Sequence, residues 1–489
     1  MKNKTKRNKI GSALAYALII MAVVLIILTS ILGYITNQVK FSSNRVQKEK
    51  AFQIAEAGIY FYRWYLAHET AGKTAQEVNN FWQNGDPLGV SSAYQGDFTD
   101  PEGGVIGSYS IEAERPKAGS TIVIVKSTGW TIQEPNLKRI IQVRFRRPSW
   151  SEYAVLANDF MRFGPGTEVF GKIHSNEGIR FDGLAHNIVS SLNTTYDDPD
   201  HGGSNEFGVH THVNPPPDSG VNNNFRPLEA PPNSVPSRSD VFLIGREFPV
   251  PEISFTGVSF DLSFMRAESL SGHGQYFDNS YGRHIILKSN GTMDVCKVSS
   301  YDSSSYRIYS YRKNSGWGTC SSCSGQCLAN YDIPDNGIIF VENNIWIEGT
   351  INNQKVTVVA ANTSGGNSRD IYIGNNNLLY TNLDGSDIIG LIAQNNISVV
   401  RDSLNVLTID AALLAQSGRV GRNYYSHFYD KDTITINGSI ATNIRYGFAY
   451  TDGTGYDNRV LNFDNNLLYF PPPYFPTGTD YYIDLWEEL

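Results

Sequence analysis

An uninterrupted apolar segment near the N-terminus constrains the fold of this chain more than any other feature. No charged residue occurs from Ile10 to Gln38, and the apolar core at 13–35 has the length of about 20 residues that a helix needs to cross a bilayer. The apolar region of a cleaved secretion signal is shorter, at about 7–15 residues. The segment therefore predicts a membrane-spanning helix rather than a conventional signal peptide.

This helix is predicted to continue well beyond the apolar segment. No proline occurs between Ser12 and His68. Apolar and small residues recur there at near-helical spacing, namely Phe41, Val46, Ala51, Ile54, Ala55, Gly58 and Ile59. At about 1.5 Å per residue, a helix over 12–70 is on the order of 85 Å long. Its first half is lipid-soluble and its second half is amphipathic.

Composition limits the class of protein. The chain has 489 residues, enough for two or three domains. Its 12% aromatic residues, 44 glycines and only 18% charged residues are typical of a folded, β-rich extracellular protein. The formal net charge is -8, and removal of a leader with its five basic residues would lower it to -13. Such a charge argues against nucleic acid as a general partner.

The leader and the helix together carry a family resemblance. A short basic leader ending at Gly11, an apolar helix opening at Ser12 and the tract AFQIAEAGI at 51–59 resemble the PilX N-terminal family of type IV pilus minor pilins. The resemblance implies that prepilin peptidase cuts after Gly11 on the cytoplasmic side and that Ser12 becomes a methylated N-terminus. The basic residues before the span keep the leader in the cytoplasm. The residues expected to pack first in the membrane and then in the fibre are Ala13, Tyr16, Leu18, Ile19, Val23, Leu25 and Ile35.

One position departs from the pattern of the major pilins. They carry a glutamate at the fifth mature position, which in this chain is Tyr16. A glutamate in lipid is costly, and pairing with the N-terminus of a neighbouring subunit offsets that cost. Its absence favours a minor or tip subunit over a shaft subunit. A plain single-span anchor is the alternative.

The rest of the chain predicts an α+β protein whose distal part is mainly β. Three segments with period-two alternation predict a small antiparallel sheet within 71–150, covering the outer half of the helix. Residues 151–489 contain short Ile- and Val-rich segments separated by Asn and Gly, which predict a parallel β-helix or solenoid, with a β-sandwich as the alternative.

Proline clusters indicate an insertion at about 192–333. The tail NLLYFPPPYFPTGTDYYIDLW is expected to cap the solenoid, or else to dock a partner. The organisation is thus a leader at 1–11, a helix at 12–70, the sheet at 71–150 and the large domain at 151–489.

Four cysteines form the first candidate site: Cys296, Cys320, Cys323 and Cys327. Outside the cytoplasm they are expected to form two disulfides, with three pairings open, and no cofactor is expected. Thiolates at Cys-x2-Cys-x3-Cys spacing also suit tetrahedral zinc, which is the alternative.

Other polar residues offer weaker signals. His210 and His212 in VHTHV, with Asp197, Asp198, Asp200 and His201 nearby, allow metal binding, but a solvated loop is the favoured interpretation. His174 is expected to hydrogen-bond within a turn. Carboxylates gathered on one face of a β-helix would indicate a polysaccharide-active enzyme, and the candidates in coil-like segments are Asp370, Asp387 and Asp410.

These observations predict a non-enzymatic minor pilin or pilus-tip subunit that acts in fibre assembly, surface adhesion or both. A domain of some 340 residues is hard to repeat along a shaft, which favours the tip. The expected partners are other pilins, the inner-membrane assembly machinery and prepilin peptidase. The chain would first span the cytoplasmic membrane once, with its distal domain outside, and then enter the pilus or reach the cell surface. The alternatives are a membrane-anchored surface-binding protein and the β-helix enzyme.

Overall fold

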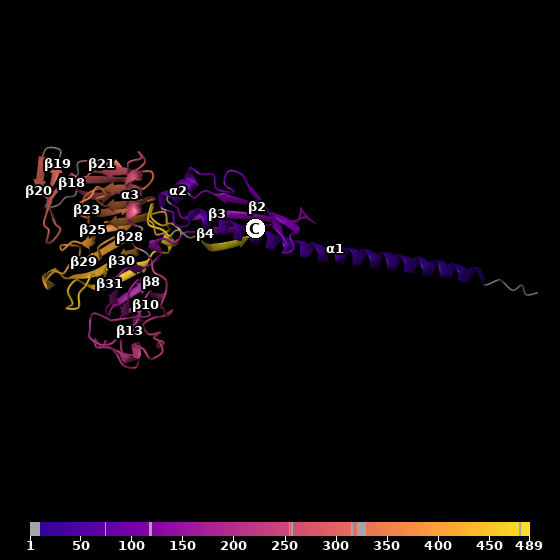
Figure 1. The fold of residues 1–489 in the computed structure, drawn as a ribbon, viewed down its shortest axis with the longest axis horizontal. Coiled ribbons are helices and arrows are strands. Elements are labelled where there is room, and N and C mark those ends of the chain that lie inside the picture. The colour runs from indigo at the N-terminus through magenta and orange to yellow at the C-terminus, as the bar shows by residue number, and fades with distance from the viewer. Residues whose placement is uncertain are drawn as a thin grey trace, which may run out of the picture.

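The computed structural model describes residues 10–73, 75–116, 120–253, 255, 258–313, 316–319, 329–478 and 481–489. A long helix, α1 (Ile10–Thr70), extends from a small antiparallel sheet, and a large β domain lies on the other side of that sheet (Figure 1). The predicted α+β class, with a long N-terminal helix, a small antiparallel sheet and a mainly parallel β domain, is confirmed.

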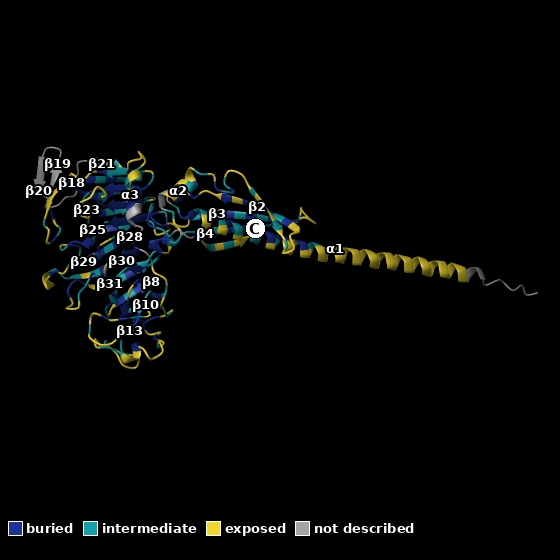
Figure 2. Ribbon diagram, in the orientation of Figure 1, coloured by how far each residue is buried: buried dark blue, intermediate teal, exposed yellow. Residues whose placement is uncertain are grey.

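The two halves of α1 have different surroundings. Residues 13–43 are exposed on every face of the helix, whereas the second half is covered by the sheet (Figure 2). Ile54, Ile59 and Tyr62 are buried against it. The helix therefore anchors one domain with its second half and leaves its apolar first half without a neighbour in the single chain.

The small sheet has five strands in the order β1-β2-β3-β4-β32, and all of its pairings are antiparallel. Burial alternates along each of the longer strands because one face packs on α1 and on α2 (Ala75–Gln83). The strands are β1 (Tyr94–Thr99), β2 (Val105–Glu114), β3 (Ile122–Thr131), β4 (Arg139–Arg146) and β32 (Tyr482–Glu488).

The fifth strand comes from the opposite end of the chain. The tail first packs Leu467 and Phe475 against an outer face of the β domain, and β32 then pairs with β4. The sequence suggested a capping tail or a docking segment. The packing of Leu467 and Phe475 agrees with a tail that packs on the solenoid, and the last strand in addition fastens the C-terminus to the small sheet.

The large domain is a solenoid of parallel strands. One side of the solenoid, here called a wall, is formed by short strands that pair in parallel. Their central residues align from each coil to the next, in the order Ile339, Val358, Leu391, Leu413, Ile440, Val155, Ile173 and Val189. All eight are buried and belong to one hydrophobic core. These parallel pairings rule out the sandwich alternative. The strands are β22 (Ile338–Val341), β24 (Lys355–Ala360), β26 (Ile388–Ala393), β28 (Val406–Ala415), β30 (Lys431–Thr442), β5 (Val155–Ala157), β8 (Ile173–Ser175) and β11 (Val189–Ser191).

A second wall is built in the same way, from β17 (Gly282–Leu287), β23 (Ile345–Ile351), β25 (Ile371–Tyr380), β27 (Ile397–Val399) and β29 (Val420–Arg422). Ile345, Ile371, Ile397 and Val420 align across neighbouring coils. At one corner Gly349 has a φ of +114°, and an added Cβ would lie 2.2 Å from the carbonyl oxygen of Leu287. Glycine permits that corner because it has no Cβ.

The chain enters this stack in the middle. From β5 it builds coils to one end at β15 (Arg246–Glu247), crosses to the other end at β16 (Gln275–Phe277), and winds back until β30 pairs with β5. The crossing contains α3 (Val258–Ser269), and Figure 1 shows β18 (Thr292–Tyr301) and β13 (Glu206–Phe207) at opposite ends of the stack. The predicted insertion range thus includes strands of the stack itself.

Candidate functional site

The exposed half of α1 is the first candidate site. Among the described residues, α1 is the only helix long and apolar enough to cross a membrane, and its apolar window has a mean hydropathy of 2.8 with no residue buried. The seven residues expected to pack in a membrane or fibre, Ala13, Tyr16, Leu18, Ile19, Val23, Leu25 and Ile35, are all exposed. Tyr16, at the position of the pilin glutamate, has 67% of its surface exposed.

The expected processing site lies at the start of this helix. α1 begins at Ile10, so Gly11 and Ser12 are its second and third residues. Residues 1–9 of the expected leader lie outside the described part of the chain.

The tract at 51–59 has a clear packing role. Strand β3 approaches the helix so closely that a Cβ on Gly129 would lie 2.3 Å from the carbonyl oxygen of Ala51 and from the amide nitrogen of Ala55. A Cβ on Gly58 would lie 2.3 Å from the hydroxyl of Ser127. Small residues on both elements therefore set the distance between helix and sheet, which explains their spacing in the sequence.

Strand β4 carries arginines that form charged pairs with neighbouring segments. Arg144 of β4 donates to Asp484 of β32 at 2.9 Å, and Arg146 pairs with Glu152 at 2.6 Å at the start of the large domain. Arg139 also pairs with Glu488. Paired side chains thus link β4 both to the C-terminal strand and to the segment that leads into the solenoid.

A buried histidine cluster is the second candidate site, at the end of the solenoid that holds β13. Five side chains, Asp198, His201, Glu206, His210 and His212, place one nitrogen or oxygen each within 4.8 Å of all the others. His210, His212 and Glu206 are fully buried. The prediction of a solvated loop was therefore wrong for this group, because the surrounding loops fold over it.

The neighbouring aspartates do not join this cluster. Asp197 is exposed, and Asp200 pairs with Arg162 at 2.8 Å and with Arg445 at 3.4 Å. Glu206 was missed in the sequence because nothing in its spacing distinguishes it from a surface residue. The density of histidine and carboxylate residues over 197–212 was the available signal.

The cysteines are only partly described. Cys296 is buried within β18 and is disulfide-bonded. Cys320, Cys323 and Cys327 lie outside the described residues.

The remaining sequence candidates act as local scaffolding. His174 contacts Ser190 Oγ and Asn176 Oδ1, each at 3.1 Å, and burial lowers its pKa. Asp387 accepts hydrogen bonds from three backbone amides, and Asp370 from the amide of Asn396. Asp410 accepts from the amide of Tyr380, and burial raises its pKa. Each carboxylate is thus occupied by the backbone or the neighbouring coil.

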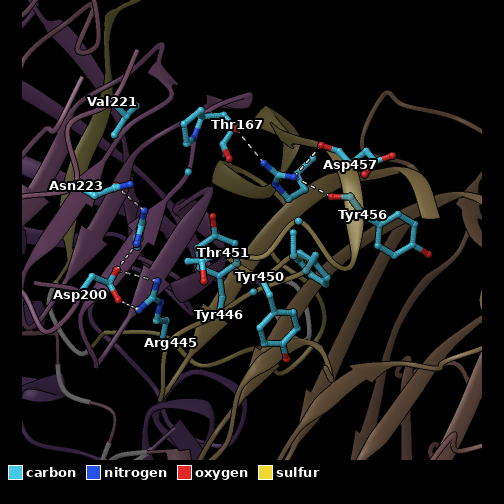
Figure 3. Close-up of a pocket in the computed structure, with 18 residues that line it drawn as sticks. Thr167, Asp200, Val221, Asn223, Arg445, Tyr446, Tyr450, Thr451, Tyr456 and Asp457 are labelled. Atoms are coloured by element: carbon cyan, nitrogen blue, oxygen red, sulfur yellow. Dashed lines mark hydrogen bonds and ion pairs between the residues drawn. The ribbon is translucent and has the colours of Figure 1, made fainter. Parts of the chain in front are cut away.

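A surface pocket of about 660 Å³ is lined by Asp200, Tyr446, Tyr450 and Thr451 among others (Figure 3). Its arginines already have partners within the protein. Arg162 and Arg445 pair with Asp200, and Arg459 donates to the carbonyl groups of neighbouring residues. The pocket is therefore a polar surface hollow whose cationic groups are engaged.

Comparison with known proteins gives a match at the N-terminus. Residues 11–59 match the family model described as PilX N-terminal. No curated protein matches the chain. Among solved structures, the crystal structure of the competence-associated pilin ComZ from Thermus thermophilus aligns with 91% of this chain and 97% of that chain. The identity is 13% and the TM-score is 0.29, so this alignment carries no argument about fold or function.

Proposed function

We propose that the protein is a minor pilin of a type IV pilus or a related pseudopilus, stationed at the fibre tip, on the premise that residues 11–59 match the PilX N-terminal family model. The single observation that carries the proposal is the division of α1. Its apolar first half is exposed on every side while its second half is held by the small sheet.

An exposed apolar helix of this length needs an apolar environment. Before assembly the lipid bilayer supplies it, since residues 13–35 are long enough to span the hydrocarbon core. After assembly the helices of other pilins supply it, and the distal domain projects outward. Prepilin peptidase and the inner-membrane assembly machinery are the partners that such a pathway requires.

Two features support the tip. The solenoid and the small sheet both lie beyond the exposed half of α1, so a large body accompanies each copy of the helix (Figure 1). Tyr16 also offers no carboxylate to pair with a neighbouring N-terminus. A subunit of this kind is suited to priming assembly or to contacting a surface from the fibre end.

The first test is the N-terminal mass of the chain recovered from sheared filaments and from membranes. The proposal expects filament material that begins at methylated Ser12. A Gly11→Leu variant should keep its leader and stay out of the filaments, whereas the control Thr5→Ala should be processed normally. A chain with an intact Met1, found only in membranes, would leave a plain membrane anchor and overturn the proposal.

Position in the fibre needs a separate test. Immunogold labelling of the distal domain should mark filament ends. Regular labelling along the shaft would rule out a location confined to the fibre tip, but it would still agree with a pilin that enters the fibre.

A further inference from the structure

The histidine cluster has the donor arrangement of a metal site. Glu206 Oε2 lies 3.0 Å from His201 Nε2, 3.1 Å from His210 Nε2 and 3.3 Å from His212 Nε2. Asp198 Oδ2 lies 3.4 Å from His201 Nε2 and 3.5 Å from His210 Nε2. Three imidazole nitrogens and two carboxylate oxygens thus lie within 4.8 Å of one another.

The opposite ring nitrogens determine which tautomer is present. Nδ1 of His210 contacts the carbonyl oxygen of Phe207 at 3.1 Å, and Nδ1 of His212 contacts that of Asn222 at 2.7 Å. Nδ1 of His201 lies 3.3 Å from the carbonyl oxygen of Gly202. A carbonyl oxygen only accepts, so each Nδ1 carries the hydrogen and each neutral ring presents a lone pair at Nε2. Metal-binding histidines are commonly held by this kind of second hydrogen bond.

Protons alone account poorly for this arrangement. In a neutral ring whose Nδ1 holds the hydrogen, Nε2 carries a lone pair and has no hydrogen to donate. Three such lone pairs face two carboxylates. Both His210 Nε2 and Asp198 Oδ2 are buried and have no hydrogen-bond partner among the described atoms. Such unsatisfied polar atoms are costly in a folded interior.

The formal charge of the buried side chains around the cluster also favours a bound divalent cation. Arg180 pairs with Asp182 at 2.8 Å and lies 3.7 Å from Asp198. With Glu206, these four buried side chains comprise three carboxylates and one guanidinium, a formal charge of -2. A single divalent cation neutralises that charge.

The donor chemistry indicates which dication fits. Calcium and magnesium prefer sites made of oxygen ligands, whereas imidazole nitrogen with carboxylate suits zinc and its neighbours. Two ligands bound at 2.0–2.1 Å to a tetrahedral zinc lie about 3.3 Å apart. The distances of 3.0–3.3 Å between Glu206 Oε2 and the three Nε2 atoms match that spacing.

We propose that this cluster binds one zinc ion that holds this end of the solenoid together, with His201, Glu206, His210 and His212 as its four ligands and Asp198 beside them. The strands here, β12 (Thr195–Tyr196), β13 and β14 (Val209–His210), have only two residues each. A metal that joins residues 201–212 stabilises a segment with little sheet structure of its own. The burial of the ligands favours a structural ion over a catalytic one.

The first test is the metal content of the full chain, purified in detergent without a histidine tag. About one zinc per chain should survive dialysis. Extended X-ray absorption fine structure at the zinc edge should show nitrogen and oxygen neighbours at about 2.0–2.1 Å. Sulfur neighbours at about 2.3 Å would instead place the ion at the cysteines and overturn the assignment.

The second test uses variants. His210→Ala with His212→Ala should remove the ion, and the matched control His427→Ala, a change in an exposed histidine paired with Asp430, should retain it. A strong chelator should make residues 195–225 of the wild-type chain sensitive to protease, and zinc should restore resistance. The wild-type measurements remain decisive if the double variant fails to fold. A wild-type chain with no bound zinc, and with protease resistance that the chelator does not change, would overturn the proposal.

Discussion

The indole Nε1 of Trp82 donates a hydrogen bond of 2.9 Å to the hydroxyl oxygen of Tyr481, although 399 positions separate them in the chain. Trp82 lies in α2, and Tyr481 directly precedes β32. Both side chains are buried in the core between α1 and the small sheet. The small sheet is therefore completed only by the last strand of the chain, which follows the whole solenoid in the sequence.

Removal of the Tyr481 hydroxyl tests this closure. Tyr481→Phe leaves the buried Trp82 Nε1 without its acceptor, and we expect the free energy of unfolding to fall by about 1–3 kcal/mol. Hydrogen exchange of the full chain should show faster exchange in β32 and β4. Tyr482→Phe is the control, because Tyr482 is half exposed. Equal exchange in the two variants would show that the bond does not hold the strand.

Gly129 tests the close contact between helix and sheet. Gly129→Ala forces a Cβ against the backbone of Ala51 and Ala55, and overpacking of this kind costs about 1–3 kcal/mol. Thermal unfolding in detergent should therefore begin at a lower temperature. In the control Gly164→Ala the new Cβ has no atom within 4 Å. An unchanged transition for Gly129→Ala would contradict the packing described for the tract at 51–59.

Asp387 tests whether the solenoid carboxylates are scaffolding. Its two oxygens accept from the amides of Gln354, Thr381 and Asn382 at 2.8–3.1 Å. Asp387→Asn replaces one acceptor oxygen with a donor, so we expect a loss of about 1–3 kcal/mol in denaturant unfolding. Asp218→Asn, on an exposed loop, should change little. Unchanged stability in Asp387→Asn would mean that the carboxylate is free for another role.

His174 tests the dependence of stability on pH. Burial lowers its pKa from the usual 6.5, so the unfolded chain takes up a proton first as the pH falls. Its contribution to stability is complete above about pH 6.5 and is lost as the pH falls through the range between the unfolded and folded pKa values. His174→Gln should therefore reduce the loss of stability between about pH 8 and about pH 5.

The control for this pH effect is His427→Gln. The hydrogen bond to Asp430 raises the pKa of His427, so its effect has the opposite sign, and the ring is exposed to solvent. Chemical denaturation at each pH measures both variants. A His174→Gln chain with the same pH dependence as the wild type would rule out this role for His174.

The helices and strands could be predicted where their pattern depends on residues close together in the sequence. The length and apolar pattern of α1 follow from residues close together in sequence, as do the alternating strands of the small sheet. Short segments rich in Ile and Val predicted parallel coils. Their order could not be predicted, because strands of similar composition stack equally well on several neighbours. Only the three-dimensional structure pairs Ile440 with Val155.

The candidate sites likewise differ in whether the sequence alone could identify them. Gly11, Ser12 and the exposed apolar residues after them form a contiguous signal that needs no tertiary structure for its interpretation. Glu206 and Asp198 carry no recognisable spacing relative to His210 and His212, so the sequence favoured a solvated loop. Folding buries these side chains together and turns the Nε2 atoms inward.

The sequence by itself determined the long helix, its lipid-soluble half and the β-rich character of the rest, because helical length and hydrophobic periodicity are properties of neighbouring residues. Tertiary structure decided the mid-stack entry of the chain, the return of β32 to the small sheet and the convergence at Glu206. Each of these depends on contacts between residues distant in the chain or on burial of polar side chains, which a linear pattern does not encode.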